Sequence, residues 1–255
     1  MKTILDKIVK TKYLEIEHIK HRKNEFLNRS ENLQSLSFLD AIDTAQLSVI
    51  AEVKKASPSK GIINHNFDYL SIAASYVSSG ARALSVLTDE HYFQGHNDYL
   101  TQIKKRVSVP VLRKDFIIDS IQIYEAYYIG ADAILLILAI LSVKQAQEFI
   151  DCARSLNLDV LVEIHSQSDI DKLLQLTGVR IIGINNRDLT TFNVNLNTSL
   201  QLKKKLESTF SDVCFVAESG YQEASECREL QENMFNAVLI GEGLVINQSL
   251  KEYFR

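Results

Sequence analysis

The sequence has few cysteines, and the three that it has form no recognisable motif. Cys152, Cys214 and Cys227 are far apart along the 255-residue chain, and no CxxC pair occurs. A disulfide framework and a structural zinc site both need closely patterned cysteines, so neither is indicated. We therefore expect buried, reduced thiols, as is usual in cytoplasmic proteins.

The sequence also lacks a long run of basic residues and a long run of apolar ones. Its formal net charge of -4 is unlike that of a dedicated nucleic-acid binder. The longest apolar run, 133–141, is too short to span a bilayer, and the charges within residues 1–10 leave no apolar core for a secretory signal. We expect a cytoplasmic protein that binds neither nucleic acid nor membrane; a monomer is expected, with a dimer as the alternative.

What the chain does have is the composition of a globular protein, with 46% hydrophobic and 24% charged residues. A chain of this length can bury a large core, as one α/β domain or two smaller ones. From Leu47 onward, short β-branched runs alternate with amphipathic segments. The expected strands span 47–53, 83–87, 109–112, 133–138, 160–162, 179–184, 213–217 and 237–240. The expected helices lie near 68–79, 98–106, 120–129, 143–156, 169–176, 198–206 and 224–234.

This alternation predicts the fold class. Eight strand–helix units favour an α/β fold of the (β/α)8 or TIM-barrel type over a doubly wound sheet, and no glycine-rich dinucleotide fingerprint follows the first strand. Gly80, Gly130 and Gly178 stand where helices should end before the next strand. We predict a single domain over 1–255.

The first 45 residues precede the first strand and form a separate helical pattern. Ile4, Leu5, Ile8 and Val9 recur at helical spacing, with Thr3 and Asp6 as an N-terminal cap. A second short helix is expected to begin at Ser37. Residues 1–45 are therefore predicted to be an N-terminal helical extension that caps the barrel of residues 46–255.

Charged and polar side chains recur where the predicted strands end. Side chains two apart on a strand share a face, so Glu52 and Lys54 point the same way after the first strand. The same spacing places Lys114, Glu163 and Asn185 on one side of their strands. Because both faces of a parallel sheet are covered, such charges are costly unless they are paired or used.

A structural layer of ion pairs is the alternative to an active site. Layers inside barrels are usually filled by branched apolar side chains, and chemistry in barrels sits at the carboxyl ends of the strands, so recurrence at several strand ends favours an active site. His165 has the opposite parity to Glu163 and is expected to orient a loop. Three other charges fit solvated loop positions equally well: Lys55, Lys60 and Asp89.

Two lysines in one pocket repel each other. We therefore expect the pKa of Lys54 or Lys114 to be lowered, unless Glu52 and Glu163 balance the two ammonium groups.

Small residues follow the last two predicted strands. Ser219-Gly220 and Gly241-Glu242-Gly243 bring backbone N–H groups to the place where barrels often bind phosphate beside a short helix. Ser57, with Lys60, lies in the loop after the first strand, which is adjacent to the eighth, and could close over the same anion. The pattern predicts a small phosphorylated substrate.

Several of these segments together resemble one family. They are 50–61 (IAEVKKASPSKG), 85–89 (SVLTD) with 93–95 (FQG), 111–116 (VLRKDF), 161–165 (LVEIH), 183–189 (GINNRDL) and 217–220 (AESG). In this order they resemble indole-3-glycerol phosphate synthase, from the N-terminal helix to the Gly241 loop. The resemblance implies a (β/α)8 barrel whose N-terminal extension lies over the active-site mouth. It also implies conversion of 1-(2-carboxyphenylamino)-1-deoxyribulose 5-phosphate to indole-3-glycerol phosphate, carbon dioxide and water, a step of tryptophan biosynthesis, with no cofactor and no metal.

The resemblance also implies roles for individual residues. Lys114 is the general acid at the substrate ketone, Lys54 grips the anthranilate carboxylate, and Glu163 gives a proton to the departing hydroxyl. Glu52 and Asn185 hold sugar hydroxyls and steer the lysines. Arg187 supports this network, and Ser219 touches the substrate. The phosphate is held by Ser57, Gly220, Gly241 and the main chain of Glu242. Phe93 and Phe116 pack on the aromatic ring or, alternatively, fill the core.

One departure and two alternative functions stay open at this stage. His96 follows the Phe-Gln-Gly motif where the family commonly has a small polar residue, and this loop variation could alter substrate entry. The first alternative is another phosphate-binding barrel, either a sugar-phosphate isomerase or an aldolase that forms a Schiff base on Lys114. The second is a non-catalytic binding barrel. Paired charges at the poorly solvated opening of the barrel weigh against it, because they are costly to keep where no reaction uses them.

Overall fold

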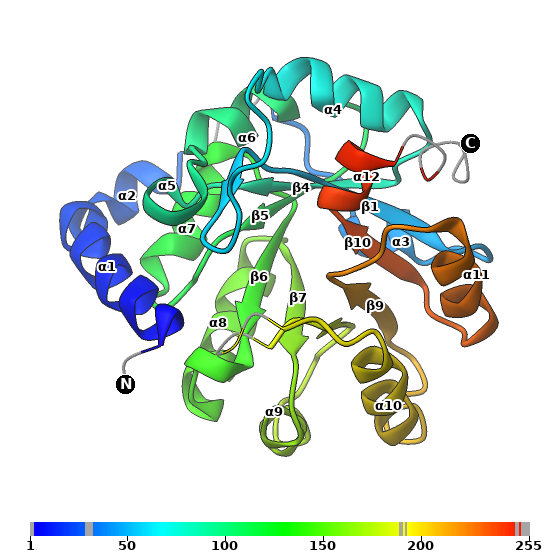
Figure 1. Cartoon of the computed structure of the whole chain (residues 1–255). Coiled ribbons are helices and arrows are strands. Elements are labelled where there is room, and N and C mark those ends of the chain that lie inside the picture. Colours follow the sequence, from blue (N-terminus) through cyan, green and yellow to red (C-terminus); the bar gives the residue numbers. More distant parts are fainter. Residues whose placement is uncertain (1–2, 29–32, 189–190, 192, 248–249, 251–255) are drawn as a thin grey trace.

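A computed structural model describes residues 3–28, 33–188, 191, 193–247 and 250. The barrel strands are β1 (Ser48–Val53), β4 (Ala83–Leu87), β5 (Val111–Lys114), β6 (Ala133–Ile137), β7 (Asp159–Ile164), β8 (Ile181–Asn185), β9 (Cys214–Glu218) and β10 (Ala237–Ile240). They pair in parallel and close in the order β1-β10-β9-β8-β7-β6-β5-β4 (Figure 1). The predicted TIM barrel is thereby confirmed, and the doubly wound alternative is excluded.

Helices follow the strands and surround the barrel (Figure 1). Those after the first strand are α4 (Tyr69–Ser78), α5 (Glu90–Phe93), α6 (Asn97–Lys104), α7 (Ile121–Ile129), α8 (Val143–Ser155), α9 (Gln167–Leu173), α10 (Asn197–Leu206), α11 (Ala224–Glu232) and α12 (Glu242–Ile246), with a 3-10 turn at Leu138–Ile140. A small hairpin of β2 (Ala56–Ser57) and β3 (Gly61–Ile62) was not predicted. It forms within the loop after β1 and brings Ser57 to the mouth of the barrel.

Burial explains why the strands lack an apolar–polar alternation. Every residue of β1 and of β6 is buried, because one strand face meets the surrounding helices and the other meets the barrel interior. Along β1, Val49 and Ala51 belong to the outer core, whereas Ile50 belongs to the inner one. The period of two therefore decides which side chains reach the interior, even where both sets are apolar.

The N-terminal extension contains the expected helices. The first, α1 (Ile4–Ile19), begins at a capping box in which the Thr3 side chain accepts from the Asp6 N–H and the Asp6 carboxylate accepts from the Thr3 N–H. A 3-10 turn (Lys20–Arg22) and α2 (Lys23–Phe26) continue it. The short helix α3 (Phe38–Ile42) is capped by Ser37, as the sequence predicts.

The extension reaches both ends of the barrel. Phe38 and Ile42 of α3 are fully buried, and the N–H groups of Phe38 and Leu39 donate to Asp159, the first residue of β7. These contacts place α3 across the amino ends of the strands. The other helix, α1, lies at the carboxyl ends, where its Ile8 lines the cavity described below. Of the extension, α1 therefore lies beside the cavity, whereas α3 lies at the opposite end of the barrel.

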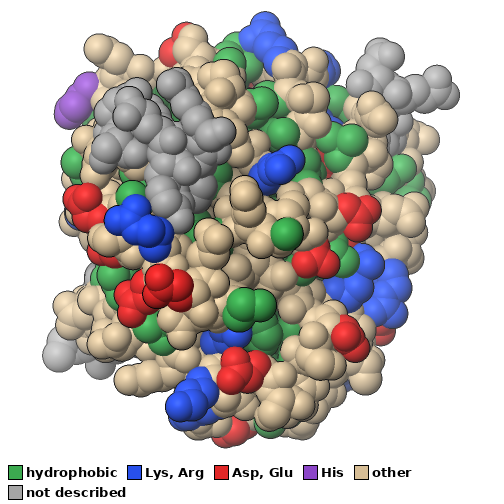
Figure 2. All heavy atoms as spheres, turned by 90° about the vertical axis from the view of Figure 1, so that its right-hand side faces the viewer, with side chains coloured by type: hydrophobic (Ala, Val, Ile, Leu, Met, Phe, Trp, Pro, Cys, Tyr) green, Lys and Arg blue, Asp and Glu red, His purple; other side chains and the backbone are tan. Residues whose placement is uncertain are grey.

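Two of the three predicted glycine helix ends are present. Gly80 and Gly130 follow the ends of α4 and α7 with positive φ, at 98° and 97°, where a side chain would be strained. Gly178 also has positive φ, 71°, but α9 already ends at Leu173. Within the described ranges, no helix is both long and apolar enough to cross a membrane. On the face shown in Figure 2, basic and acidic side chains are interspersed over the part drawn in colour.

Replacing Phe38 by alanine should reduce the free energy of unfolding by about 3–5 kcal/mol, because the ring is fully buried and its loss leaves a cavity at the amino end of the barrel. Urea unfolding monitored by circular dichroism measures the change. Leu14→Ala on α1, at a side chain 63% exposed, is the control and should change stability by less than about 0.5 kcal/mol. A Phe38→Ala effect as small as that of Leu14→Ala would contradict the assigned position of α3.

Candidate active site

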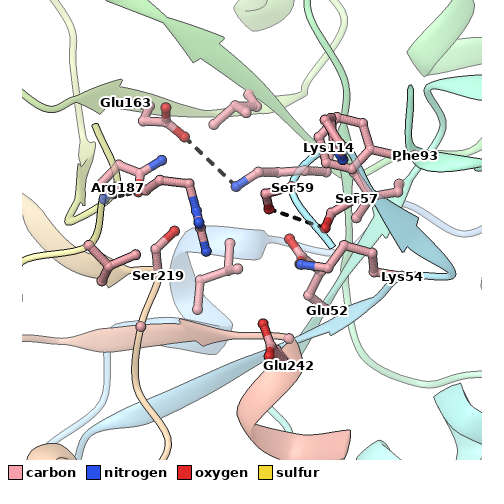
Figure 3. Close-up of a pocket in the computed structure, with 18 of the residues that line it drawn as sticks. Glu52, Lys54, Ser57, Ser59, Phe93, Lys114, Glu163, Arg187, Ser219 and Glu242 are labelled. Atoms are coloured by element: carbon pink, nitrogen blue, oxygen red, sulfur yellow. Dashed lines mark hydrogen bonds and ion pairs between the residues drawn. The ribbon is translucent and has the colours of Figure 1, made fainter. Parts of the chain in front are cut away.

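A cavity of about 420 Å³ opens at the carboxyl ends of the strands. Every site residue predicted from the sequence lines it: Glu52, Lys54, Ser57, Phe93, Lys114, Phe116, Glu163, Asn185, Arg187, Ser219, Gly220, Gly241 and Glu242. Figure 3 shows Lys114 reaching toward Glu163, with Glu52, Lys54, Arg187 and Ser219 around the same hollow. The strand ends thus bring together residues that are far apart in the sequence.

Glu52 and Lys54 form an ion pair at the end of β1. Burial acts to raise the pKa of Glu52, but the ammonium groups of Lys54 and Lys114 outweigh it and lower this pKa. The Glu52 carboxyl is therefore ionised at neutral pH. Gly241, at the end of β10, leaves room for the pair, since a Cβ there would lie 2.5 Å from the Glu52 carboxylate.

Lys114 ends β5 and points into the barrel. Its Nζ lies 2.8 Å from Oε2 of Glu218 and 3.8 Å from Oε2 of Glu163. Burial acts to lower the pKa of Lys114, but Glu218, Glu163 and Glu52 together raise it above the ordinary value. For this lysine the glutamates balance the charge, which is the condition under which no lowered pKa is expected. A cationic amine does not form a Schiff base readily, which weighs against the aldolase alternative.

Glu218 is the functional side chain that the sequence-based selection missed. It is the last residue of β9, it is 1% exposed, and it reaches Lys114 across the barrel interior. Burial raises the pKa of Glu218 to about 7; Lys114 opposes this rise, and Glu163 and Glu52 add to it. The period of two would have found it, because Cys214 and Val216 of the same parity also face the interior.

A glycine on the neighbouring strand makes space for this carboxylate. Gly183 lies on β8, and a Cβ at this position would be 2.1 Å from Oε1 of Glu218. Any larger residue would displace the glutamate from Lys114. Glycine at position 183 is therefore explained by packing, because the buried carboxylate of Glu218 on β9 occupies the space of a side chain.

Glu163 has one buried carboxylate oxygen without a partner. Its side chain is buried at the end of β7, and Oε1 has no hydrogen-bond partner in the structure. A buried carboxylate oxygen in this state is costly unless a ligand satisfies it. Beside it, the Asn185 side chain accepts a hydrogen bond from the Arg187 N–H, which fixes the turn that follows β8.

The loops after β9 and β10 form the other end of the cavity. Ser219 and Gly220 both have positive φ, at 66° and 99°, and this conformation is uncommon for a serine. The short helix α12 begins at Glu242, directly after Gly241. Lys60, from the loop between β2 and β3, donates a hydrogen bond to the Glu242 side chain and so joins the two loops.

An aromatic wall lies across the cavity from these loops. The rings of Phe93 and Phe116 have centroids 6.0 Å apart, and both line the cavity beside Ile8. Asp89 lies behind them and is fully buried, which excludes the solvated loop position that the sequence left open for it. It accepts hydrogen bonds from the N–H groups of Tyr92 and Phe93 and pairs with Lys12 on α1, a partner that only the fold brings near.

The histidines lie outside the cavity lining. Nδ1 of His165 is 2.9 Å from Oδ2 of Asp169, and this contact raises the histidine pKa. His96 caps α6, where its side chain accepts the Asp98 N–H. His18 and His21 are exposed, and among the described residues no cluster of histidine, cysteine, aspartate and glutamate could hold a metal ion.

Comparison with known proteins identifies the family. A family model described as indole-3-glycerol phosphate synthase matches residues 5–255. The chain belongs to the indole-3-glycerol phosphate synthase family. The synthase of Chloroherpeton thalassium is 46% identical over 258 residues, which cover 98% of this chain and 98% of that protein. The synthase of Polynucleobacter asymbioticus is also 46% identical, over 96% of this chain and 95% of its own length.

A third synthase, from Priestia megaterium, is 46% identical over 95% of this chain and 92% of its own length. Among solved structures, KGPDC from Streptococcus mutans superposes with a TM-score of 0.62 at 9% identity, covering 82% of this chain and 95% of that one. At this identity the likeness concerns the fold alone. The family resemblance inferred from the sequence segments is confirmed.

The Glu218 carboxyl should be half protonated near pH 7, and Lys114→Met should raise its pKa further, because the variant removes the cation that lowers it. NMR titration of 13C-labelled glutamate carboxyls measures both values. Since the folded-state pKa exceeds the ordinary value of 4.5, this group's contribution to stability is fully present below about pH 4.5 and is lost as the pH rises through about 7.

Lys20→Met, at an exposed lysine of the N-terminal extension, is the control for this titration and should leave the Glu218 pKa unchanged. A Glu218 pKa at its ordinary value in the unsubstituted protein would contradict the charge balance described around Lys114.

Proposed function

We propose that this chain converts 1-(2-carboxyphenylamino)-1-deoxyribulose 5-phosphate to indole-3-glycerol phosphate, carbon dioxide and water, as a carboxy-lyase of tryptophan biosynthesis. Family membership supports the reaction. The observation that carries the assignment of the site is the buried cation of Lys114, held between Glu218 and Glu163 at the base of the cavity. No cofactor takes part in the proposed steps.

The cavity offers a matching surface to each part of this substrate. Phe93, Phe116 and Ile8 supply an apolar wall for the anthranilate ring. Lys54 lies on the polar side and would pair with the anthranilate carboxylate. The volume of about 420 Å³ is within the range of small-molecule sites.

The phosphate would bind at the loop end of the cavity. Ser57, Gly220 and Gly241 line it there, together with Glu242, whose backbone N–H opens the short helix α12. Barrels frequently bind phosphate with the loops that follow the last two strands. Ser219, which lines the cavity next to Gly220, would contact the substrate at the same end.

Ring closure is the first chemical step. The ring carbon that bears the carboxylate attacks the ketone carbon, a carbon–carbon bond forms, and the ketone oxygen takes a proton from Lys114. A cation fixed at this oxygen stabilises the charge that develops there. Loss of carbon dioxide then leaves its bonding electrons on the ring and restores its aromatic character.

Dehydration is the second step, and it needs a proton donor at the new hydroxyl. Glu163 is buried 3.8 Å from the Lys114 ammonium and has an oxygen without a partner, so we assign the donation to Glu163. The hydroxyl leaves as water, and the Glu163 carboxylate takes up the proton lost from the sugar carbon next to the nitrogen, which completes the indole and restores the acid. Glu218, whose pKa is about 7, orients Lys114 and returns a proton to it.

The other polar residues position the substrate and the two lysines. Glu52 holds Lys54 by an ion pair and, with Asn185, would accept hydrogen bonds from the sugar hydroxyls. Arg187 lines the cavity and lowers the pKa of Glu52 through its charge, after Lys54 and Lys114. These side chains make the site electrostatically complementary before substrate arrives.

For the chain as a whole we propose one domain over residues 1–255, acting in the cytoplasm as a monomer or a dimer on a phosphorylated small molecule. The free thiols of Cys152, Cys214 and Cys227 support a reducing compartment.

Purified protein should form indole product from 1-(2-carboxyphenylamino)-1-deoxyribulose 5-phosphate, and Lys114→Ala should lower kcat by about 100-fold or more, because the ketone loses its acid. Indole fluorescence follows the reaction. Lys144→Ala on α8, at an exposed lysine, is the control and should retain the original rate. A well-folded chain that forms no product would overturn the proposed function.

Glu163→Gln should separate the two chemical steps. The amide keeps the shape but cannot donate the proton, so a single turnover should release carbon dioxide in an amount equal to the enzyme while indole formation slows by about 100-fold or more. Glu148→Gln, at an exposed residue of α8, is the matched control. Equal slowing of carbon dioxide release and indole formation would place Glu163 in ring closure and remove its assigned role.

A further inference from the structure

Lys12 is a buried cation supplied by the N-terminal extension. Its side chain, on α1, is only 2% exposed. Nζ lies 2.9 Å from Oδ2 of Asp89, 2.9 Å from Oδ1 of Asp115 and 2.8 Å from Oε2 of Glu15. Asp89 and Asp115 come from the loops after β4 and β5, so one ammonium joins two barrel loops to the extension.

The same two aspartates fix the aromatic wall of the cavity. Oδ1 of Asp89 accepts the N–H of Phe93 at 3.1 Å, and Oδ1 of Asp115 accepts the N–H of Phe116 at 2.8 Å. Each carboxylate therefore contacts both Lys12 and the backbone of a cavity-lining phenylalanine, Asp89 through its two oxygens and Asp115 through Oδ1 alone. Through them, Lys12 sets the relative position of the two rings.

Electrostatics make this arrangement depend on the ammonium group. Asp89 and Asp115 are both almost fully buried, and both approach the same Nζ, so without it their charges would face each other in a medium of low dielectric. Burial acts to raise the pKa of Asp115, but Lys12 and Arg113 lower it to about 2. Removing the Lys12 ammonium would leave these two buried carboxylates close to each other. Asp115 would still have Arg113 as a partner, with the guanidinium nitrogen 3.4 Å from Oδ2.

Neighbouring contacts of α1 act on the same part of the cavity. Ile8, one turn before Lys12, lines the cavity and packs in the inner core with Phe116. The hydroxyl of Thr11 lies 2.9 Å from that of Tyr92, the residue before Phe93. The face of α1 toward the barrel is thus built around the loops that carry the aromatic wall.

We propose that Lys12 is a positioning residue for the substrate's aromatic ring, acting through Asp89 and Asp115 on the spacing of Phe93 and Phe116. The proposal rests on the proposed function, because that function brings an anthranilate ring to this wall. Lys12 itself does not line the cavity and has no contact with the reacting atoms. Its effect is therefore on recognition of the ring and not on the phosphate end.

Lys12→Met tests the proposal, with two small probes that report on opposite ends of the cavity. Binding of anthranilate, measured by ligand-observed NMR, should weaken by about tenfold, whereas inhibition by inorganic phosphate should be unchanged. KM for the full substrate should rise while kcat per folded molecule changes less. Lys20→Met, at an exposed lysine of the same extension, is the matched control and should bind both probes normally.

A compensating variant distinguishes charge balance from simple packing. In Lys12→Met with Asp89→Asn, the amide oxygen can still accept the Phe93 N–H, but the repulsion between the two carboxylates is gone. This double variant should regain part of the anthranilate affinity lost in Lys12→Met. If Lys12→Met does not fold, the double variant is compared with the single variant Asp89→Asn. The single variant keeps Lys12 and should bind anthranilate several-fold more tightly than the double variant.

Any of three results would overturn the proposal. The first is normal anthranilate binding by Lys12→Met, and the second is an equal loss of anthranilate and phosphate binding. The third is a fall in kcat with unchanged KM, the result expected if Lys12 had a purely structural role. In the fallback comparison, equal anthranilate affinity of the double variant and Asp89→Asn would do the same. Turnover by the unsubstituted protein decides the proposed function separately, because the two binding measurements need no catalysis.

Discussion

The balance of charge around Lys114 is the constraint on which the rest of the site depends. A buried ammonium persists only where carboxylates compensate its loss of hydration, and here Glu218 on β9 and Glu163 on β7 do so, with β8 between their strands. Their separation is set by the closed sheet, and the space for Glu218 is left by Gly183 on the adjoining strand. The protonation of Lys114 therefore depends on the strand pairing. A shift in strand register would move Glu218 and Glu163 away from its ammonium group.

The cavity divides into parts with different mechanical support. Most of the ionisable groups lie at strand ends. Glu163 and Glu218 are paired with both neighbouring strands, and Glu52 and Lys114 with one, which holds them in place. The aromatic wall is instead carried by the loops after β4 and β5 and is completed by α1. The proposed phosphate end is formed by turns, including the left-handed pair Ser219 and Gly220. Chemistry is thus assigned to the most rigid part and recognition to the loops.

Local patterns in the sequence predicted much of this arrangement. Parity along single strands placed Lys54, Lys114 and Glu163 on one rim, because a strand's geometry depends on nearest neighbours alone. Glu218 was missed because the parity rule was not extended to the seventh predicted strand, where Cys214 and Val216 share its side. The role of Asp89 stayed open for a different reason: its partner Lys12 lies on a helix that only tertiary packing brings near. Long-range pairing of charges has no periodic trace in the sequence, and neither has the docking of α3 at the amino end.

The pairing of β1 with β10 also constrains how the chain can assemble. β1 is the first barrel strand to be synthesised and β10 the last, so one edge of β1 stays unpaired until residues 237–240 have left the ribosome. The extension made before β1 faces a similar delay, because Asp115 and Asp159, which anchor α1 and α3, come later in the chain. Contacts between distant parts of a sequence slow folding. During synthesis, the open edge of β1 is therefore the longest-lived exposed surface of the barrel sheet.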